Sequence, residues 1–242
     1  MPAQRILAFS SSRVGKSGFL ETVVPVVKKF LGNAQLKIAF VPFASLGSAE
    51  EYFSMVSKAF AAPNLSFKLI DATNGLQTLN SCNAIMIGGG NTFKLLHDLY
   101  AFNLLEVIKS KVENGVPYIG WSAGSNITGQ TISTTNDMPI IEPASFKALN
   151  FYPFQLNPHY INEEIDGHNG ETRDQRLIEF CTLNPTVPIV GLPEGTFLQL
   201  ENNVLVYNGI SQGSFFINNG SSGTIKSGIE PSANLSYLLL NQ

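Results

Sequence analysis

The amino-acid sequence predicts an α/β fold in which a mostly parallel sheet is flanked by helices on both faces. Short apolar runs alternate with longer runs of helical periodicity through the first two-thirds of the chain. This alternation is typical of βαβ units, whose crossover helices cover both faces of a sheet. From residue 196 onward, short strand-like runs separated by Asn and Gly turns replace it. We therefore expect a C-terminal antiparallel β portion that ends the sheet.

Five short apolar runs are the expected parallel strands: Ile6–Phe9, Lys37–Val41, Phe67–Ile70, Ala84–Ile87 and Tyr118–Trp121. Four longer segments between them are the expected helices: Leu20–Leu31, Glu50–Ala61, Phe93–Tyr100 and Leu104–Asn114. In the last of these, apolar residues recur every fourth position along one face, as in an amphipathic helix. The expected antiparallel strands are Thr196–Leu200, Val204–Tyr207 and Gly213–Ile217.

The composition is that of a folded protein with a large core. Hydrophobic residues make up 44% of the 242 residues and charged residues only 14%, whereas disordered chains are rich in charge and poor in apolar groups. The net charge is −3, and no cluster of Lys and Arg is dense enough for a nucleic-acid-binding surface. The chain has neither a Pro- or Ser-rich linker nor an internal repeat. We expect residues 1–242 to form a single domain.

Cysteine usage and the apolar runs bear on where the protein works. Cys82 and Cys181 lie far apart and in no CxxC pattern, so we expect two reduced thiols. The apolar run near the N-terminus is too short for a signal peptide, and no later run approaches the length of a membrane span. We therefore expect a cytoplasmic protein without membrane contact, either a monomer or a small homo-oligomer.

The segment Gly120-Trp121-Ser122-Ala123-Gly124 lies between a predicted strand and a predicted helix. A G-x-S-x-G sequence at such a junction is the nucleophile-elbow pattern. The serine of an elbow sits on a strained turn, and side chains at the glycine positions would collide with the neighbouring strand and helix. The pattern predicts Ser122 as the nucleophile of a serine hydrolase, at the carboxyl end of a strand. The alternative is a glycine-rich turn whose serine has no catalytic role.

Three successive glycines, Gly88–Gly90, follow another predicted strand. Their backbone N–H groups can approach a ligand closely, which suits one half of an oxyanion hole. We expect Gly89 or Gly90 to supply one donor and Ala123, the residue after the nucleophile, to supply the other. A phosphate-binding turn is the alternative, but Phe93 stands at the last position of the G-x-G-x-x-G pattern.

A nucleophilic serine needs a base, and the chain has three histidines. His97 lies in the middle of a predicted helix, where a packing or surface role is expected. His159 follows Pro158, which stiffens the chain, whereas His168 lies in a polar, glycine-flanked loop. Because a base must keep its ring oriented, His159 is favoured over His168.

Two carboxylates are candidates for orienting the imidazole. Asp137 gives the chain order Ser…Asp…His, which is the order in α/β-hydrolases, and is therefore favoured. Glu194 lies between two glycines in Gly191-Leu192-Pro193-Glu194-Gly195, where a tight turn between two strands is the alternative explanation. It is the second candidate.

Five segments of the chain together resemble peptidase E, the α-aspartyl dipeptidase family of serine peptidases. They are Gly88–Phe93, Gly120–Asn126, Asn136–Pro139, Asn157–Tyr160 and Pro193–Thr196, in the order in which the family has them. The resemblance implies a flavodoxin-like fold of the class I glutamine amidotransferase type. It also implies an enzyme without cofactor or metal, acting through an acyl-enzyme on Asp-Xaa dipeptides that have a free amino group.

Carried over by position, the resemblance implies roles for single residues. Ser122 would be the nucleophile, His159 the base and Asp137 the orienting carboxylate, with Glu194 also in a family segment near the active site. Asn91 and Thr92, in the glycine-rich segment, would bind substrate.

Arg173 matches a family segment suited to binding the aspartyl carboxylate of the substrate. A guanidinium pairs with a carboxylate through two parallel hydrogen bonds, which lysine cannot reproduce. A solvated position in the first turn of a helix is the alternative for Arg173. Arg176 lies three residues further on, along the same helix face, and is the second candidate.

Other functions find weaker support in the sequence. Val14-Gly15-Lys16-Ser17 resembles the end of a P-loop, but Ser10 stands where that motif requires its first glycine. A metal hydrolase would lack a compact ligand motif. Its candidate ligands are His159, Glu163, Asp166 and His168. Two further alternatives are a cyanophycinase-like β-aspartyl exopeptidase of the same clan and a catalytically inactive ligand-binding homologue.

Overall fold

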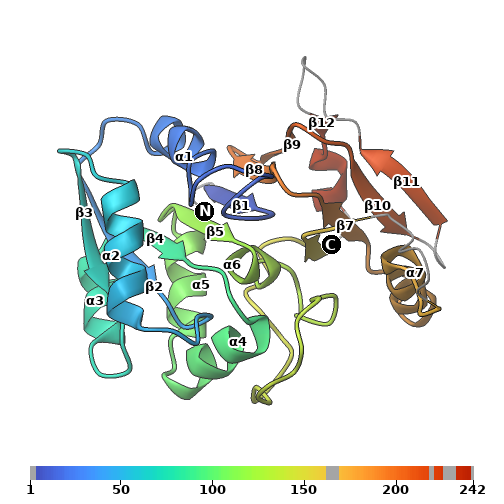
Figure 1. The fold of residues 1–242 in the computed structure, drawn as a ribbon, viewed down its shortest axis with the longest axis horizontal. Helices are drawn as coiled ribbons and strands as arrows, with labels where there is room; N and C mark the ends of the chain where they lie inside the picture. The colour runs from blue at the N-terminus through green and yellow to red at the C-terminus, as the bar shows by residue number, and fades with distance from the viewer. Residues whose placement is uncertain (1–3, 162–168, 218–220, 226–232, 241–242) are drawn as a thin grey trace.

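The computed structural model describes residues 4–161, 169–217, 221–225 and 233–240, which form two β-sheets and the helices that cover them (Figure 1). Five parallel strands make up one side of the larger sheet, with β3 at its edge. They are β1 (Ile6–Phe9), β2 (Leu36–Val41), β3 (Leu65–Leu69), β4 (Ala84–Ile87) and β5 (Tyr118–Trp121). Each overlaps one of the five apolar runs predicted as strands, which confirms the α/β fold class.

Antiparallel strands extend the larger sheet beyond β1. They are β8 (Thr196–Glu201), β9 (Val204–Gly209) and β12 (Ala233–Asn234). Within the described residues the order is β12-β9-β8-β1-β5-β4-β2-β3. The expected antiparallel end of the sheet is therefore present, built from the first two of the three predicted C-terminal strands.

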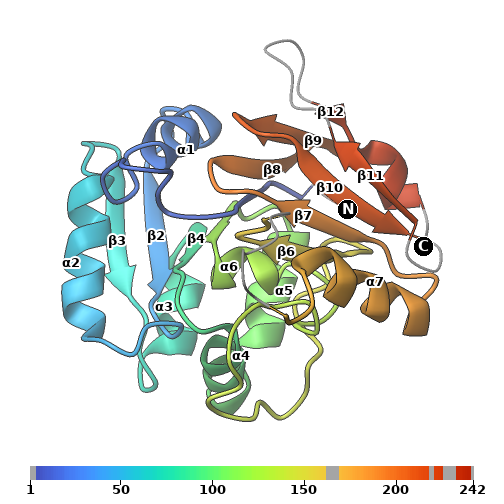
Figure 2. The same ribbon diagram turned by 45° about the vertical axis from the view of Figure 1, so that its right-hand side comes forward.

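A second, smaller sheet contains three strands that the sequence patterns did not indicate and one, β10, that they did. It consists of β6 (Gln155–Pro158), β7 (Ile189–Leu192), β10 (Gly213–Ile217) and β11 (Ser221–Ile225). In the described chain these strands have the order β11-β10-β7-β6, and β6 and β7 run parallel. The prediction that β10 continues the larger sheet was wrong, because β10 pairs with β7 and β11 (Figure 2).

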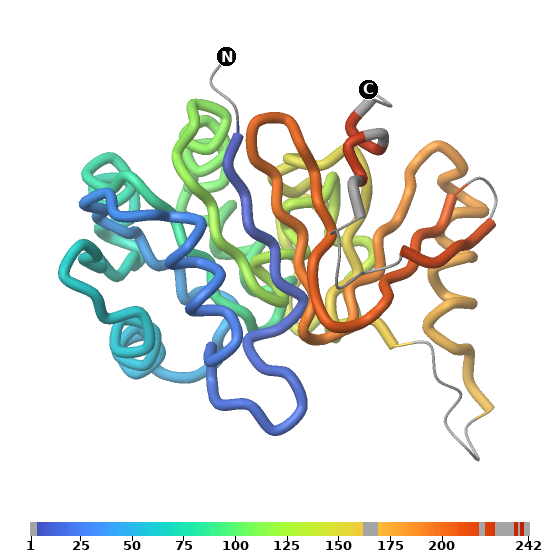
Figure 3. Tube along the Cα trace, turned by 90° about the horizontal axis from the view of Figure 1, so that it is seen from above, coloured from blue at the N-terminus to red at the C-terminus, as the bar shows by residue number. Residues whose placement is uncertain are grey.

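Helices pack on both faces of the larger sheet. On one face lie α1 (Val23–Leu31) and α2 (Ala49–Ala59). On the other lie α3 (Gly75–Ser81), α4 (Thr92–Ala101) and α5 (Leu105–Glu113), with the short α6 (Ala123–Asn126) at the end of β5 (Figure 3). Helix α7 (Arg173–Leu183) packs on the smaller sheet, and a 3₁₀ helix spans Ser236–Leu240. None of the helices in the described residues has the length and apolar character that crossing a membrane requires.

The alternation of side chains along the strands divides the core. Leu7 and Phe9 of β1 pack with α1 and α2, whereas Ile6 and Ala8 pack on the opposite side. The cluster on that opposite side continues into the smaller sheet through residues such as Leu156. The two sheets therefore share one hydrophobic core, and the carboxyl ends of β1, β5, β6 and β7 meet where they join.

Candidate active site

Ser122 lies at the junction of β5 and α6, as the elbow pattern predicts. Its backbone has φ 53° and ψ −114°, a conformation that a residue with a side chain rarely adopts. The Ser122 N–H donates to the carbonyl oxygen of Phe9 on β1 at 3.1 Å, which fixes the turn to the neighbouring strand. The strained turn places the serine hydroxyl at the carboxyl edge of the sheet.

The two glycines of the elbow permit close approaches that no other residue would. A Cβ atom at Gly120 would lie 2.4 Å from the carbonyl oxygen of Gly124 in α6. A Cβ atom at Gly124 would lie 2.2 Å from the carbonyl oxygen of Ile87 at the end of β4. Both contacts are far inside van der Waals distance, so the expected collisions with helix and strand are confirmed.

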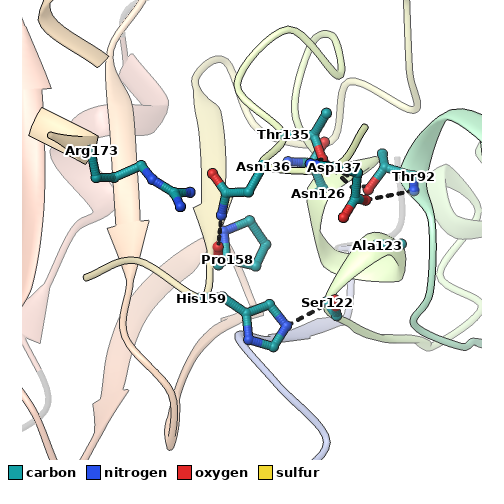
Figure 4. A pocket seen from close by; sticks show the side chains of 10 residues that line it. All are labelled: Thr92, Ser122, Ala123, Asn126, Thr135, Asn136, Asp137, Pro158, His159 and Arg173. Carbon is teal, nitrogen blue, oxygen red and sulfur yellow. Dashed lines mark hydrogen bonds between the residues drawn. The ribbon is translucent and has the colours of Figure 1, made fainter. Parts of the chain in front are cut away.

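The imidazole of His159 connects the serine to a carboxylate. Its Nε2 lies 3.0 Å from the Oγ of Ser122 (Figure 4). Its Nδ1 lies 2.8 Å from the Oε1 of Glu194. His159 follows β6 and itself has a positive φ of 53°. The structure thus brings together a hydroxyl, an imidazole and a carboxylate in one chain of hydrogen bonds, the arrangement that activates a serine.

Asp137 does not contact His159, and the prediction that it orients the imidazole is corrected in favour of Glu194. Its Oδ2 accepts hydrogen bonds from the N–H of Thr92 at 2.7 Å and from the hydroxyl of Thr135 at 3.3 Å. The tertiary structure explains why the sequence favoured the wrong carboxylate. Glu194 follows β7, and β7 is the parallel neighbour of the strand that His159 follows, a pairing that no sequence pattern indicated.

Ser10 holds the histidine in place and was not singled out from the sequence. It is buried at the end of β1, where its hydroxyl accepts from the N–H of His159 at 3.0 Å and donates to the carbonyl oxygen of Leu192 at 2.7 Å. One serine on the larger sheet therefore fastens the ends of β6 and β7. In the sequence it is only the first polar residue after a strand.

Gly90 and Ala123 are the candidate donors of an oxyanion hole. No described residue accepts a hydrogen bond from the backbone N–H of either one. The N–H of Gly89, by contrast, donates to the hydroxyl of Tyr52 at 3.0 Å. This N–H is already engaged, so the prediction that Gly89 is a donor of the oxyanion hole is corrected in favour of Gly90. The same hydroxyl accepts from the indole N–H of Trp121 at 3.0 Å, and burial raises the pKa of Tyr52 to about 12. Tyr52 thus ties the glycine turn to β5.

A pocket of about 220 Å³ opens beside the serine and the histidine. Its described lining consists of Thr92, Ser122, Ala123, Asn126, Thr135, Asn136, Asp137, Pro158, His159 and Arg173 (Figure 4). Pockets for drug-sized ligands usually measure roughly 300–1,000 Å³, so this one suits a smaller ligand. Asn91 does not line it, because its side chain caps α4 at Lys94 and donates to the carbonyl oxygen of Met138. The prediction that Asn91 binds substrate is corrected accordingly.

Arg173 provides a positive charge on one side of this pocket. It is the first residue of α7, and its Nη1 is buried without a hydrogen-bond partner among the described residues. Burial, and secondarily the charge of Arg176, lowers the pKa of Arg173. A buried guanidinium nitrogen without a partner is unfavourable in the free protein, and an anionic ligand would supply the missing acceptor.

Comparison with known proteins shows to which family the chain belongs. The sequence profile of Peptidase family S51 matches residues 6–217. The chain belongs to this family. Among its relatives, a peptidase E of Nostoc sp. is 47% identical over 205 residues, which are 84% of each chain. A peptidase E of Shewanella baltica is 49% identical over 201 residues, covering 82% of this chain and 84% of the relative. The chain is accordingly a peptidase and a hydrolase.

Solved structures share the fold of this S51 peptidase. A crystal structure of a protein from Listeria monocytogenes EGD-e superposes with a TM-score of 0.67 at 23% identity, covering 86% of this chain and all of the other. A peptidase from an acI-B1 Actinobacterium gives the same TM-score at 15% identity and covers 96% of this chain and 97% of its own.

Of the two other histidines, only His97 lies within the described residues of the S51 peptidase. His97 lies on α4 with its Nδ1 2.9 Å from the carboxylate of Asp98, away from Ser122, as expected of a packing or surface residue. His168 lies outside the described residues, as do all the proposed metal ligands except His159. In the part of the chain that is described, no group of three His, Cys, Asp or Glu side chains could hold a metal ion.

Proposed function

We propose that this S51 peptidase is a serine-type dipeptidase that releases the N-terminal aspartate of Asp-Xaa through an acyl-enzyme. The observation that carries the proposal is the hydrogen-bonded series from Ser122 through His159 to Glu194, beside a small pocket that also holds Arg173. Relatives named peptidase E support it.

Acylation uses the two ring nitrogens of His159. The Nε2 takes the proton of Ser122 as the serine oxygen attacks the peptide carbonyl carbon, and the Nδ1–H is held by Glu194. The carboxylate keeps the imidazole in the required tautomer and stabilises the imidazolium ion. The negative oxygen of the tetrahedral intermediate is stabilised by the N–H groups of Gly90 and Ala123.

In the breakdown of this intermediate, His159 acts as an acid instead of a base. His159 returns its proton to the amine of the leaving residue, the C–N bond breaks, and the aspartyl group remains esterified to Ser122. A water molecule, deprotonated by His159, then attacks the ester carbonyl carbon. The C–O bond to Ser122 breaks, the serine oxygen takes the proton back from His159, and free aspartate is released.

Selection of aspartate rests on Arg173. Its Nη1 has no hydrogen-bond partner among the described residues, so an anionic ligand is favoured there over a cationic one. A carboxylate can accept two hydrogen bonds from a guanidinium group at once. The small volume of the pocket disfavours longer side chains and extended peptides.

A panel of dipeptides tests the proposal. We expect cleavage of Asp-Xaa, and little or none of Glu-Xaa, Asn-Xaa and β-Asp-Xaa, by the wild-type protein. Ser122→Ala should lower kcat by roughly 10⁴-fold or more without changing the melting temperature greatly. Near-normal hydrolysis of Asp-Leu by that variant would refute the role of Ser122.

The same panel separates the alternatives of other substrate classes. Preference for β-Asp-Xaa would indicate a cyanophycinase-like exopeptidase. Absence of any cleavage, together with no labelling of Ser122 by a fluorophosphonate, would indicate a binding homologue without catalytic activity.

A further inference from the structure

Asp137 presents one free carboxylate oxygen to the pocket. Its Oδ2 is engaged by the N–H of Thr92 and the hydroxyl of Thr135, which fixes the side chain at the beginning of α4. No described residue donates a hydrogen bond to its Oδ1. Among the described residues that line the pocket, Asp137 carries the one carboxylate. A negative charge is therefore held in a defined orientation at the pocket wall.

Asn126 supplies a second acceptor without a donor. Its side chain is 2% exposed, lines the pocket, and donates through Nδ2 to the carbonyl oxygen of Leu156 at 3.0 Å. That bond decides which end of the amide is the oxygen, because only the NH₂ group can donate. The Oδ1 is buried and accepts no hydrogen bond from any described residue. A buried acceptor left unpaired costs stability, and a ligand that donates to it would remove that cost.

These acceptors lie close to the nucleophile and across the pocket from the guanidinium. Asn126 is one helical turn after Ser122, and its N–H donates to the Ser122 carbonyl oxygen at 2.9 Å. Figure 4 shows Asp137 and Asn126 on one side of the pocket and Arg173 on the other. No ion pair joins Asp137 to Arg173 in the described structure. The pocket thus keeps a negative and a positive group apart, and a ligand with both charges would satisfy each.

We propose that Asp137 and Asn126 together bind the α-ammonium group of the substrate's N-terminal residue, an inference that rests on the proposed function. An ammonium group carries three N–H donors and no acceptor, which matches two oxygens that lack donors. In the substrate this group is attached to the carbon next to the scissile carbonyl, so it must lie near Ser122. Charge-assisted bonds at this place would fix the carbonyl for attack.

This assignment predicts that only peptides with a free amino terminus are cleaved. An acylated or internal aspartate has a neutral amide in place of the ammonium, with one donor and a bulky substituent. Such a group has no positive charge to pair with Asp137 and offers one N–H to two acceptors. Asp137 and Asn126 would thereby limit hydrolysis to the first residue of a peptide.

The test compares two chromogenic substrates that differ only at the ammonium position. L-Aspartyl p-nitroanilide carries it, whereas succinyl mono-p-nitroanilide has the same carboxylate and the same scissile amide with hydrogen in its place. Asp137→Asn keeps an oxygen that can accept from Thr92 and so preserves the anchor. The matched control is Glu142→Gln, which removes the same charge from an exposed position in the same loop.

We expect Asp137→Asn to lower kcat/KM for the aspartyl substrate roughly 100-fold and to leave the value for the succinyl substrate within about twofold. Glu142→Gln should change neither value. Equal losses on both substrates would overturn the inference and assign Asp137 a structural role at Thr92.

Failure of the proposed function would be recognised separately, as an absence of turnover of both substrates by the wild-type protein. Calorimetric titration with L-aspartate and with succinate then decides the inference by itself. Tighter binding of L-aspartate by the wild-type protein, lost in Asp137→Asn, supports the ammonium site. Equal binding of the two acids by the wild-type protein contradicts it.

Discussion

The imidazole of His159 and the carboxylate of Glu194 lie 2.8 Å apart because each follows one of two neighbouring parallel strands. The register pairs the last residues of these strands, Pro158 and Leu192, so the chain leaves both at the same level. The nucleophile comes from the other sheet. The site is therefore assembled where the carboxyl ends of strands from two sheets meet, as in other open α/β sheets.

Replacement of Glu194 tests which carboxylate orients the base. We expect Glu194→Gln to lower kcat roughly 10³-fold or more with little change in KM, because an amide neither stabilises the imidazolium ion nor enforces the tautomer. The loss should be equal on the aspartyl and succinyl anilides, unlike that of Asp137→Asn. Steady-state kinetics on both substrates, with a thermal melt to verify folding, would measure it. A nearly active Glu194→Gln protein would show that the carboxylate beside His159 is not needed for catalysis.

Replacement of Arg173 should weaken substrate binding and raise the stability of the protein. We expect Arg173→Met to raise KM for Asp-Xaa roughly 30-fold or more, through loss of a charge-assisted pair. The folded-state pKa of Arg173 is lowered by burial, so folding disfavours its charged form. Burial of the charged guanidinium therefore lowers the free energy of unfolding at every pH at which the arginine is charged. This cost disappears only at strongly alkaline pH.

The Arg173→Met protein should therefore melt at a higher temperature than the wild type at neutral pH, and succinate should stabilise the wild type alone. Arg176→Met, at an exposed position of the same helix, is the control and should keep the wild-type KM. An equal rise in KM on a neutral dipeptide would show that Arg173 does not bind the side chain.

Removal of the Tyr52 hydroxyl should loosen the glycine turn. Tyr52→Phe leaves the N–H of Gly89 and the indole N–H of Trp121 without their acceptor, at a cost of roughly 1–3 kcal/mol. We expect a lower melting temperature and a kcat reduced roughly tenfold at constant KM, because the adjacent Gly90 donor loses its support. Tyr100→Phe, whose hydroxyl bonds the backbone of a surface loop, is the control. An unchanged kcat in Tyr52→Phe would separate this tyrosine from the oxyanion hole.

Substitution of an elbow glycine should prevent correct folding. The Cβ atom of Gly124→Ala would lie 2.2 Å from a backbone oxygen of β4, which cannot move without disrupting the sheet. We expect a loss of more than about 3 kcal/mol of unfolding free energy, measured by urea denaturation. Gly47→Ala, whose new methyl group meets only a side-chain oxygen at 3.6 Å, should be tolerated. Wild-type stability of Gly124→Ala would contradict the packing described for the elbow.

Selective chemical labelling should distinguish the serine from the cysteines. Burial raises the pKa of both Cys82 and Cys181, which keeps the thiols protonated and unreactive. We expect a fluorophosphonate to abolish activity with one adduct on Ser122, and iodoacetamide to leave activity intact at neutral pH. Mass spectrometry of the treated protein would locate the adducts. Inactivation by iodoacetamide at either cysteine would argue for thiol chemistry instead.

The central sheet and the nucleophile could be predicted from the sequence because local patterns carry them. Strands β1, β4 and β5 are buried along their whole length and so appear as continuous apolar runs, and the elbow is contained in five consecutive residues. Helix α1, by contrast, begins later than predicted. Leu20 is apolar and buried but has a φ of 59°, which excludes it from a helix.

Strand β6 and the Glu194 contact could not be predicted because tertiary contacts determine them. Two residues of this strand, Gln155 and Asn157, are polar yet buried, and their amides bond to the loop around Thr131 and Asn136. No apolar alternation marks such a strand. Without it, the parallel pairing that brings Glu194 to His159 is invisible in the sequence.

The division of the site between two sheets has a mechanical consequence. Ser122 belongs to the larger sheet, whereas His159 and Glu194 belong to the smaller one, with buried Ser10 as a direct link between them. Arg173 lies on α7, which packs on the smaller sheet. A compound bonded covalently to Ser122 and paired with Arg173 would therefore connect the two sheets and restrict their relative motion. The tetrahedral adducts that best imitate the reaction should then also be the compounds that most rigidify the molecule.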